Sequence, residues 1–309
     1  MHGLVVKNTG SWYSVLTDEG TLEQCAVQGN FRIKGIKSTS PVVIGDRVEI
    51  SDGMITSVDD RKNYIVRKSI NLSKQSHILA ANLDQCFLII TVNHPVTSTT
   101  FIDRFLATAE AYNIPVVLVF NKLDIYTDED KEYMRMMKDL YENIGYKCVV
   151  ISAITGEGMD EIRMMLDSKV SLVSGNSGVG KSTFINALLP DLNLKTADIS
   201  DVHDTGMHTT TFSEMYPFKT KTDTDEVPNS FIIDTPGIKG FGSFDMQREN
   251  ISHYFREIFN YSHDCRFNNC THTHEPGCAV LEALERHDIS QSRYSSYLSM
   301  LEEGDGKYR

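Results

Sequence analysis

The feature that most constrains this 309-residue chain is the segment Gly175–Ser182, which reads G-N-S-G-V-G-K-S. It follows an apolar run, Val170–Val173, that is typical of a buried strand, and it leads into a predicted helix, Lys181–Leu189. Glycines at this spacing let the backbone wrap a phosphate so that successive N–H groups point inward. The Lys181 ammonium can then reach the β- and γ-phosphates, and the Ser182 hydroxyl can bind Mg²⁺. The segment therefore predicts a phosphate-binding loop.

We expect this loop to supply most of the contacts to a nucleotide. Lys181 is in addition a candidate catalytic residue, because its charge can stabilise a phosphoryl transition state. The predicted ligands of the phosphates and of the bound Mg²⁺ are Gly175, Asn176, Ser177, Gly178, Val179, Gly180, Lys181, Ser182 and Thr183.

A second motif, Asn121-Lys122-Leu123-Asp124, follows the apolar run Val116–Phe120. An aspartate carboxylate can accept hydrogen bonds from N1–H and the N2 amine of guanine, which adenine does not offer, so Asp124 predicts selectivity for guanine. Further on, Ser152-Ala153 ends another strand, where the Ala153 N–H can donate to guanine O6. Taken alone, the Asn121–Asp124 motif can also be an exposed loop with a helix-capping aspartate.

The metal side of the site is predicted from Asp234-Thr235-Pro236-Gly237, which closes the apolar strand Phe231–Ile233. Asp234 can hold Mg²⁺ through water, and the Gly237 N–H can sense the γ-phosphate. In the polar loop before this strand, the run Thr209–Thr211 offers hydroxyls that can complete the Mg²⁺ shell, and Thr210 is our candidate. The alternative is that this run merely keeps the loop solvated.

The order of these motifs is unusual. In an ordinary GTPase the phosphate loop comes first and the guanine motif late, whereas here residues 121–124 and 152–153 precede residues 175–182 and 234–237. A circular permutation preserves the same sheet provided that the old chain ends lie close together. The sequence therefore predicts a circularly permuted domain that binds and hydrolyses GTP with Mg²⁺.

Three regions differ in their pattern. Short β-rich runs dominate residues 1–66 and suit a small barrel, most simply an OB-fold, although an unspecialised β-barrel is an alternative. From about residue 80, apolar strands alternate with helices, which indicates a mostly parallel sheet covered on both faces. After Gly242 the chain is mainly helical, and its predicted helices are Met246–Phe259, Cys278–His287 and Ile289–Glu303.

Composition excludes several classes. The net charge is −12, which argues against general coating of nucleic acid. Residues 1–74 carry ten basic and eight acidic side chains, so a local RNA-contacting face remains open there. No apolar run approaches the roughly 18 residues of a membrane span, and no secretory signal is recognisable. We therefore expect a cytoplasmic protein that does not act at a membrane.

Cys265, Cys270 and Cys278 cluster with histidines near the end of the chain. In a cytosolic protein such clustering favours metal over disulfide, and His272, His274 and His263 are rival donors for a fourth position.

The reversed motif order, the preceding barrel and the following cluster together resemble the RsgA (YjeQ) family of circularly permuted GTPases. The resemblance implies an OB-fold domain over 1–67, a GTPase domain over 68–242 and a zinc-binding helical domain over 243–309. It also implies late maturation of the small ribosomal subunit, contact with its rRNA, and GTP hydrolysis stimulated by that particle. We expect a monomer.

The same resemblance bears on ligands and catalysis. Cys265-x4-Cys270-x-His272-x5-Cys278 matches the family's zinc signature, which implies one structural Zn²⁺. His208 matches the histidine of the family's Gly-Arg-His-Thr-Thr switch and is a candidate catalytic residue, although Met207 replaces the arginine. Ile238 stands where Ras-like proteins carry the water-orienting glutamine, so intrinsic hydrolysis should be slow. His208 can equally be a switch histidine without a chemical role.

Two other functions are compatible with the motifs. The chain can be a ribosome-docking switch that uses GTP only to gate binding, or a GTPase that hands zinc to other proteins. The first predicts hydrolysis unchanged by small subunits, and the second predicts an exchangeable metal.

Overall fold

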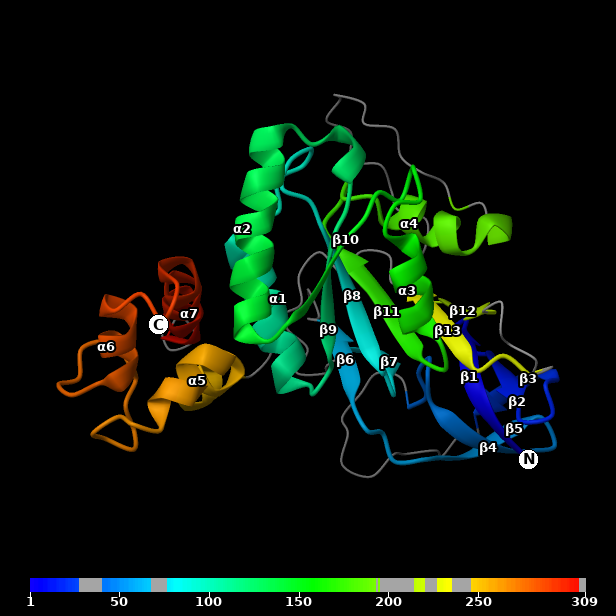
Figure 1. Cartoon of the computed structure of the whole chain (residues 1–309). Helices are drawn as coiled ribbons and strands as arrows, with labels where there is room; N and C mark the ends of the chain where they lie inside the picture. The colour runs from blue at the N-terminus through cyan, green and yellow to red at the C-terminus, as the bar shows by residue number, and fades with distance from the viewer. Residues whose placement is uncertain are drawn as a thin grey trace.

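The computed structural model describes residues 1–27, 41–67, 77–192, 194, 214–219, 227–234 and 246–305. Figure 1 shows a small barrel at one side, a central sheet with helices, and a group of helices at the other side. None of the helices in these ranges combines the length and the apolar character needed to cross a bilayer.

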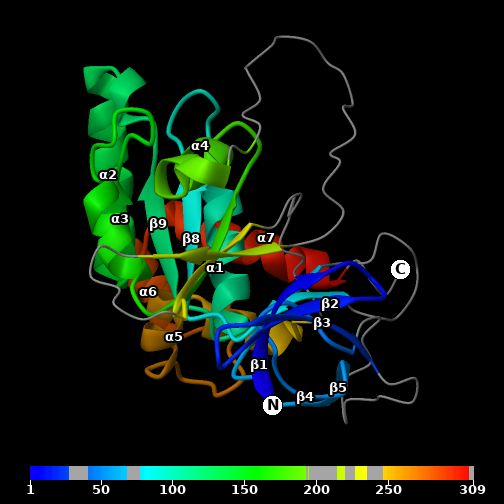
Figure 2. The ribbon, with the colours of Figure 1, turned by 90° about the vertical axis from the view of Figure 1, so that its right-hand side faces the viewer.

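The N-terminal strands form a closed barrel, which Figure 2 shows in blue beneath the central sheet. Neighbouring strands follow the order β1-β2-β3-β5-β4, and β4 pairs back onto β1. Among these five described strands, only the β3–β5 pair is parallel. Val5, Val15 and Ile55 fill the interior, each with 0% exposure. The OB-fold prediction is confirmed. The strands are β1 His2–Asn8, β2 Tyr13–Thr17, β3 Leu22–Val27, β4 Arg47–Ser51 and β5 Met54–Val58.

The central sheet has five parallel strands in the order β10-β9-β8-β11-β13. β12 pairs antiparallel with β13. The strand that leads into the phosphate loop, β11, therefore lies between β8, the first of these strands along the chain, and β13, the last. The strands are β8 Gln85–Ile90, β9 Val116–Phe120, β10 Lys147–Val150, β11 Val170–Gly175, β12 Glu214–Phe218 and β13 Ser230–Asp234. The predicted mostly parallel sheet is confirmed.

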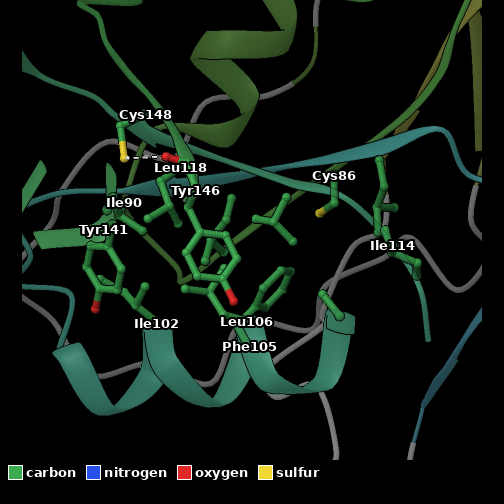
Figure 3. Close-up of a cluster of buried hydrophobic side chains, with 14 of the residues drawn as sticks. Cys86, Ile90, Ile102, Phe105, Leu106, Ile114, Leu118, Tyr141, Tyr146 and Cys148 are labelled. Atoms are coloured by element: carbon green, nitrogen blue, oxygen red, sulfur yellow. Dashed lines mark hydrogen bonds between the residues drawn. The ribbon is translucent and has the colours of Figure 1, made fainter. Parts of the chain in front are cut away.

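Helices cover both faces of this sheet. Successive side chains of each strand point to opposite faces, and both sets are apolar and must be buried. Leu88 and Ile90 of β8 pack with α1 and α2, whereas Phe87 and Ile89 pack with α3 and α4. Figure 3 shows the first of these layers, with Phe105 and Leu106 of α1 beneath Ile90 and Leu118. The helices are α1 Thr99–Ala111, α2 Asp128–Ile144, α3 Met159–Leu166 and α4 Lys181–Leu188.

The barrel and the sheet are joined by hydrogen bonding. β1 pairs with β12 at Lys7 and Glu214, whose side chains form an ion pair of 2.7 Å, so one sheet of 11 strands runs through both parts. The sequence did not predict β12. It also did not predict the hairpin of β6 Tyr64–Arg67 and β7 His77–Ala81, which follows the barrel.

The C-terminal helices pack beside α1 and α2, on the side away from the barrel (Figure 1). The predicted single helix Met246–Phe259 is wrong. Phe255 is extended, with φ −110° and ψ 101°, and its buried ring lies in the core of this region, so the chain turns there. Two short helices result. The elements are the 3-10 helix Arg248–Tyr254, α5 Arg256–Ser262, α6 Ala279–Glu285 and α7 Gln291–Asp305. Two further 3-10 turns are Leu123–Ile125 and Pro190–Leu192.

A buried charge network fixes these helices against α1. The Arg293 guanidinium donates to Asp103 at 2.9 Å and to both oxygens of Glu257 at 2.6 and 3.0 Å. Tyr141 and Ser296 also donate to the Asp103 carboxylate, at 2.8 and 2.6 Å. Burial raises the pKa of Asp103, and the facing Arg293 charge opposes that shift. Both oxygens of the Asp103 carboxylate have hydrogen-bond partners. The network therefore fixes how the C-terminal helices pack against α1.

Candidate nucleotide site and metal cluster

Parallel strands place the predicted nucleotide ligands along one edge of the sheet. Asn121 follows β9 directly, Ser152 lies just beyond β10, Gly175 ends β11 and Asp234 ends β13. The carboxyl ends of these strands all point the same way, which is where open α/β sheets bind their ligands. Residues far apart along the chain are thereby gathered at one edge.

Asn121 joins three of the predicted loops. Its side chain is buried, donates from Nδ2 to the Val179 carbonyl at 2.9 Å, and accepts at Oδ1 from the Ala153 N–H at 3.0 Å. The phosphate loop and the Ser152-Ala153 loop are therefore both bonded to the guanine motif. These three segments form one unit.

Two glycines of the phosphate loop are needed for this close approach. A Cβ at Gly175 would lie 2.4 Å from the Ile89 carbonyl oxygen, and one at Gly180 would lie 2.5 Å from Asn121 Nδ2. Both residues also have positive φ, 146° and 96°, which disfavours any side chain. The spacing of glycines in the motif thus follows from contacts with β8 and with Asn121.

Lys181 begins α4 and lies over the phosphate loop. Its Nζ donates to the carbonyls of Gly175 and Asn176 at 2.7 and 2.6 Å. Burial lowers the pKa of Lys181, and the negative charge of Asp234 opposes that shift. Burial likewise raises the pKa of Asp234, opposed by Lys181. The cation and the carboxylate therefore lie close enough to influence each other at the ends of β11 and β13.

The side chain of Asp124 is exposed and oriented by a neighbouring hydroxyl. Ser152 donates to its Oδ1 at 2.5 Å, and the Thr155 N–H donates to the same Ser152 hydroxyl at 3.1 Å. The carboxylate is thus held in a defined orientation at the protein surface. Thr155 was not singled out from the sequence.

Lys122 packs against the phosphate loop from the guanine side. Its backbone is left-handed, with φ 72°, and its Nζ donates to the His94 carbonyl at 2.5 Å. Its Cε would be 4.0 Å from a Cβ at Gly180. Burial lowers the pKa of Lys122, opposed by the charge of Asp124. The end of the Lys122 side chain therefore lies beside the phosphate loop at Gly180.

Three predicted site residues, His208, Thr210 and Gly237, lie outside the described residues. So do Met207 and Ile238.

The C-terminal cluster brings together Cys265, Cys270, His272 and Cys278, whose ligand atoms all lie within 4.8 Å of one another. The Cys265 and Cys278 sulfurs lie 3.6 and 3.5 Å from His272 Nδ1, and 3.9 Å from each other. A tetrahedral zinc site with bonds of about 2.3 Å to sulfur and about 2.0 Å to nitrogen requires roughly 3.5 Å and 3.8 Å for these separations. The group can hold a tetrahedral metal ion.

The protein around the cluster holds His272 in place. Its backbone has φ 56°, and its carbonyl accepts a hydrogen bond from the Tyr294 hydroxyl at 2.7 Å. The rival histidines make other contacts, because His274 bonds to Thr273 at 2.8 Å and His263 packs edge-to-face with Phe259. The side chain that completes the group is His272.

Glu275 fixes the backbone of the same loop. Burial acts to raise its pKa, but hydrogen bonds from the Thr271 hydroxyl and from the N–H groups of Thr271, Thr273 and His274 outweigh it, so the pKa is lowered. The loop is therefore ordered by a carboxylate as well as by the cysteines.

The fold and the site define a class. A parallel sheet with a phosphate loop after its interior strand β11, bonded to a guanine motif that comes earlier in the chain, is the arrangement of a circularly permuted P-loop GTPase. A family model described as "RsgA GTPase" matches residues 58–244, and one described as "RsgA N-terminal domain" matches residues 2–59. The chain belongs to the RsgA GTPase family and is a GTP hydrolase.

Relatives and solved structures match this chain over nearly its full length. The "Small ribosomal subunit biogenesis GTPase RsgA" of Bacteroides fragilis is 61% identical, covering 100% of this chain and 99% of the relative. The protein of the same name from Porphyromonas gingivalis is 56% identical over the same shares. The crystal structure of YjeQ from Thermotoga maritima matches with a TM-score of 0.79 and 34% identity, covering 99% of this chain and 98% of that one. The crystal structure of YloQ, described as a circularly permuted GTPase, has a TM-score of 0.76 and 26% identity, covering 100% and 96%.

Proposed function

We propose that this GTPase couples its nucleotide state to late maturation of the small ribosomal subunit, and that the subunit stimulates hydrolysis. The observation that carries the nucleotide part is the bonding of Asn121 to both Val179 and Ala153, which makes the base and phosphate motifs one site. The ribosomal part is supported by the printed names of relatives up to 61% identical over the whole chain. The ribosomal particle and its rRNA are the proposed partners.

In the proposed site, guanine lies against the Asp124 carboxylate. The Ala153 N–H, which the sequence predicts to donate to guanine O6, donates to Asn121 Oδ1 in this structure. The Asp124 carboxylate accepts from N1–H and the N2 amine, and Ser152 orients it. Asn121 braces the loops, and the Lys122 alkyl chain lies alongside the nucleotide. Missing donors on adenine would leave the carboxylate unpaired, which gives the selectivity.

The phosphates lie in the loop of residues 175–183. Its backbone N–H groups and the Lys181 ammonium stabilise the charge that develops as water attacks the γ-phosphate in line. Lys181 is partly buried near Asp234, so its charge is less screened by water than on an open surface, and it counts for more. Ser182, Asp234 through water, and Thr210 are the proposed holders of Mg²⁺, which when bound neutralises phosphate charge.

Other roles rest on the sequence alone. The Gly237 N–H is proposed to sense the γ-phosphate. His208 is proposed to help position the attacking water, because Ile238 lacks a polar group for that purpose.

The C-terminal cluster is proposed to hold one structural Zn²⁺ through Cys265, Cys270, His272 and Cys278. Four protein ligands close the coordination sphere, so the ion has no open position for catalysis. Its proposed role is to order the loop that packs against Tyr294 and Tyr297 of α7.

We further propose domain boundaries of 1–67, 68–242 and 243–309, a monomeric state, and action in the cytoplasm, where small subunits mature. The family models overlap at residues 58–59, which is before the proposed first boundary at residue 67.

The test is single-turnover GTP hydrolysis with and without purified small subunits. We expect stimulation by at least about tenfold, as for GTPases that lack a built-in water-orienting group. Unchanged hydrolysis accompanied by nucleotide-dependent co-sedimentation would instead establish a docking switch. If small subunits neither stimulate hydrolysis nor co-sediment with the protein, the ribosomal subunit is excluded as a partner.

A further inference from the structure

Tyr126 is a buried tyrosine beside the guanine motif, with 5% of its surface exposed. Its hydroxyl donates to the Asn121 carbonyl at 2.6 Å and accepts from the Val92 N–H at 3.0 Å. Val92 lies just beyond β8, and Asn121 just beyond β9. One phenol therefore ties together the ends of two neighbouring strands.

The same hydrogen bond closes the loop that carries Asp124. The chain leaves β9 at Asn121, makes the 3-10 turn Leu123–Ile125 and reaches Tyr126, whose N–H donates to the Leu123 carbonyl at 3.3 Å. The phenol then reaches back to Asn121, where the loop began. Asp124 is held in the middle of a loop that is pinned at both ends.

All the hydrogen-bonding groups of Asn121 have partners. Its N–H donates to the Ile90 carbonyl at 2.9 Å, and its side chain bonds to Val179 and Ala153. Three of these partners lie in the sheet or in recognised motifs, whereas the fourth partner is Tyr126. A shift of the Asn121 backbone would displace both loops that its side chain braces.

From this geometry we infer that Tyr126 is a positioning residue for guanine recognition, acting through Asn121 and Asp124. The inference rests on the proposed role of Asp124 in binding the base. Burial raises the pKa of Tyr126 to about 12, so the phenol keeps its proton and can donate throughout the neutral range.

A purely structural role predicts something different. A tyrosine that only fills the core would, when altered, weaken every nucleotide to the same extent, because the whole site would loosen. A positioning role predicts a larger loss of affinity for ligands that donate more hydrogen bonds to the Asp124 carboxylate. Guanine offers that carboxylate two donors, whereas hypoxanthine lacks the N2 amine and offers one.

The experiment compares the dissociation constants of GDP and IDP for Tyr126→Phe in the full-length protein. Phenylalanine keeps the ring in the core and removes only the hydroxyl. We expect GDP to bind about tenfold more weakly and IDP about threefold more weakly, so the preference for GDP narrows about threefold. In steady-state hydrolysis KM for GTP should rise while kcat stays near wild type. The matched control is Tyr133→Phe on α2, an exposed tyrosine, which should change neither constant.

Each outcome decides the matter. Equal loss for GDP and IDP, or no loss for either, overturns the positioning role. A wild-type protein that binds IDP as tightly as GDP would instead overturn the proposed role of Asp124. Reversible unfolding of the variant would raise the apparent dissociation constants of GDP and IDP by the same factor, so the ratio of the two constants still tests the positioning role.

Discussion

The Asn121 Nδ2 donates to the Val179 carbonyl at 2.9 Å, across 58 residues of sequence. In this sequence the guanine motif precedes the phosphate loop, yet the two are in direct contact. The order of elements along the chain therefore does not affect the geometry of the site. What matters is that β9 and β11 are both neighbours of β8 in one parallel sheet.

Asn121→Ala should impair binding and stability together. The change leaves the Val179 carbonyl and the buried Ala153 N–H without their partner, which costs about 1–3 kcal/mol for each buried group. We expect GDP affinity to fall by at least about tenfold in a fluorescent-nucleotide titration. The control is Asn143→Ala on the exposed side of α2, and equal affinities of the two variants would refute the bracing role.

Asp124→Asn should exchange nucleotide preference. An amide presents an N–H in place of one carboxylate oxygen, which suits the C2 carbonyl of xanthine and repels the N2 amine of guanine. Competition binding with GTP and XTP should show a shift of at least about tenfold toward XTP. Asp128→Asn at the start of α2 is the control, and unchanged selectivity in Asp124→Asn would exclude this residue from base recognition.

Lys181→Ala should stop turnover without unfolding the protein. Removal of one preorganised charge from a transition state costs about 100- to 1000-fold in rate. The lysine bonds only to carbonyls of its own loop among the hydrogen bonds found in the described residues, so thermal melting should stay close to wild type. Lys147→Ala, in an exposed ion pair, is the control. Substantial hydrolysis by Lys181→Ala would remove the lysine from catalysis.

Cys270→Ser should release the metal and loosen the C-terminal helices. Elemental analysis should find about one zinc per wild-type chain and much less in the variant, because a structural site binds weakly once a ligand is lost. Proteolysis should then cut first within the C-terminal region. Cys148→Ser, a buried cysteine away from the cluster, should keep its zinc. Loss of zinc from the wild type during brief chelation would indicate an exchangeable ion.

Arg293→Met should destabilise the junction between α1 and α7. It leaves Asp103, whose side chain is 0% exposed, and Glu257 without their cation, and such uncompensated burial costs about 3–5 kcal/mol. Urea unfolding should detect this as a loss of that size or as an early transition of the C-terminal helices. Arg286→Met removes a solvent-exposed ion pair and should cost less than about 1 kcal/mol. Similar midpoints for the two variants would contradict the prediction.

Much of the nucleotide domain could be predicted from sequence because its strands are continuous apolar runs. β8, β9 and β11 are buried on both faces, so most of their positions are apolar, and β9 and β11 each lead into a recognisable motif. The phosphate loop was predictable for a similar reason, since Gly175 and Gly180 are fixed by contacts with Ile89 and Asn121.

Elements decided by tertiary contact were not predictable. β12 is only five residues long, contains Pro217 and has polar neighbours, so nothing in its own sequence marks it as a strand. The break at Phe255 depends on burial of its ring among helices distant in sequence. Tyr126 reads as an ordinary core tyrosine, because no local pattern shows that its hydroxyl meets Asn121.

The continuity of the sheet across β1 and β12 has a consequence for any truncated form of this protein. Removing residues 1–58 would uncover the outer backbone edge of β12 at Glu214, where β1 now pairs. Pro217 has no N–H to offer an added strand, so it would hinder pairing only at the end of β12 away from Glu214. A fragment without its barrel would therefore tend to self-associate strand to strand, and its oligomers would reflect the cut, not the native protein.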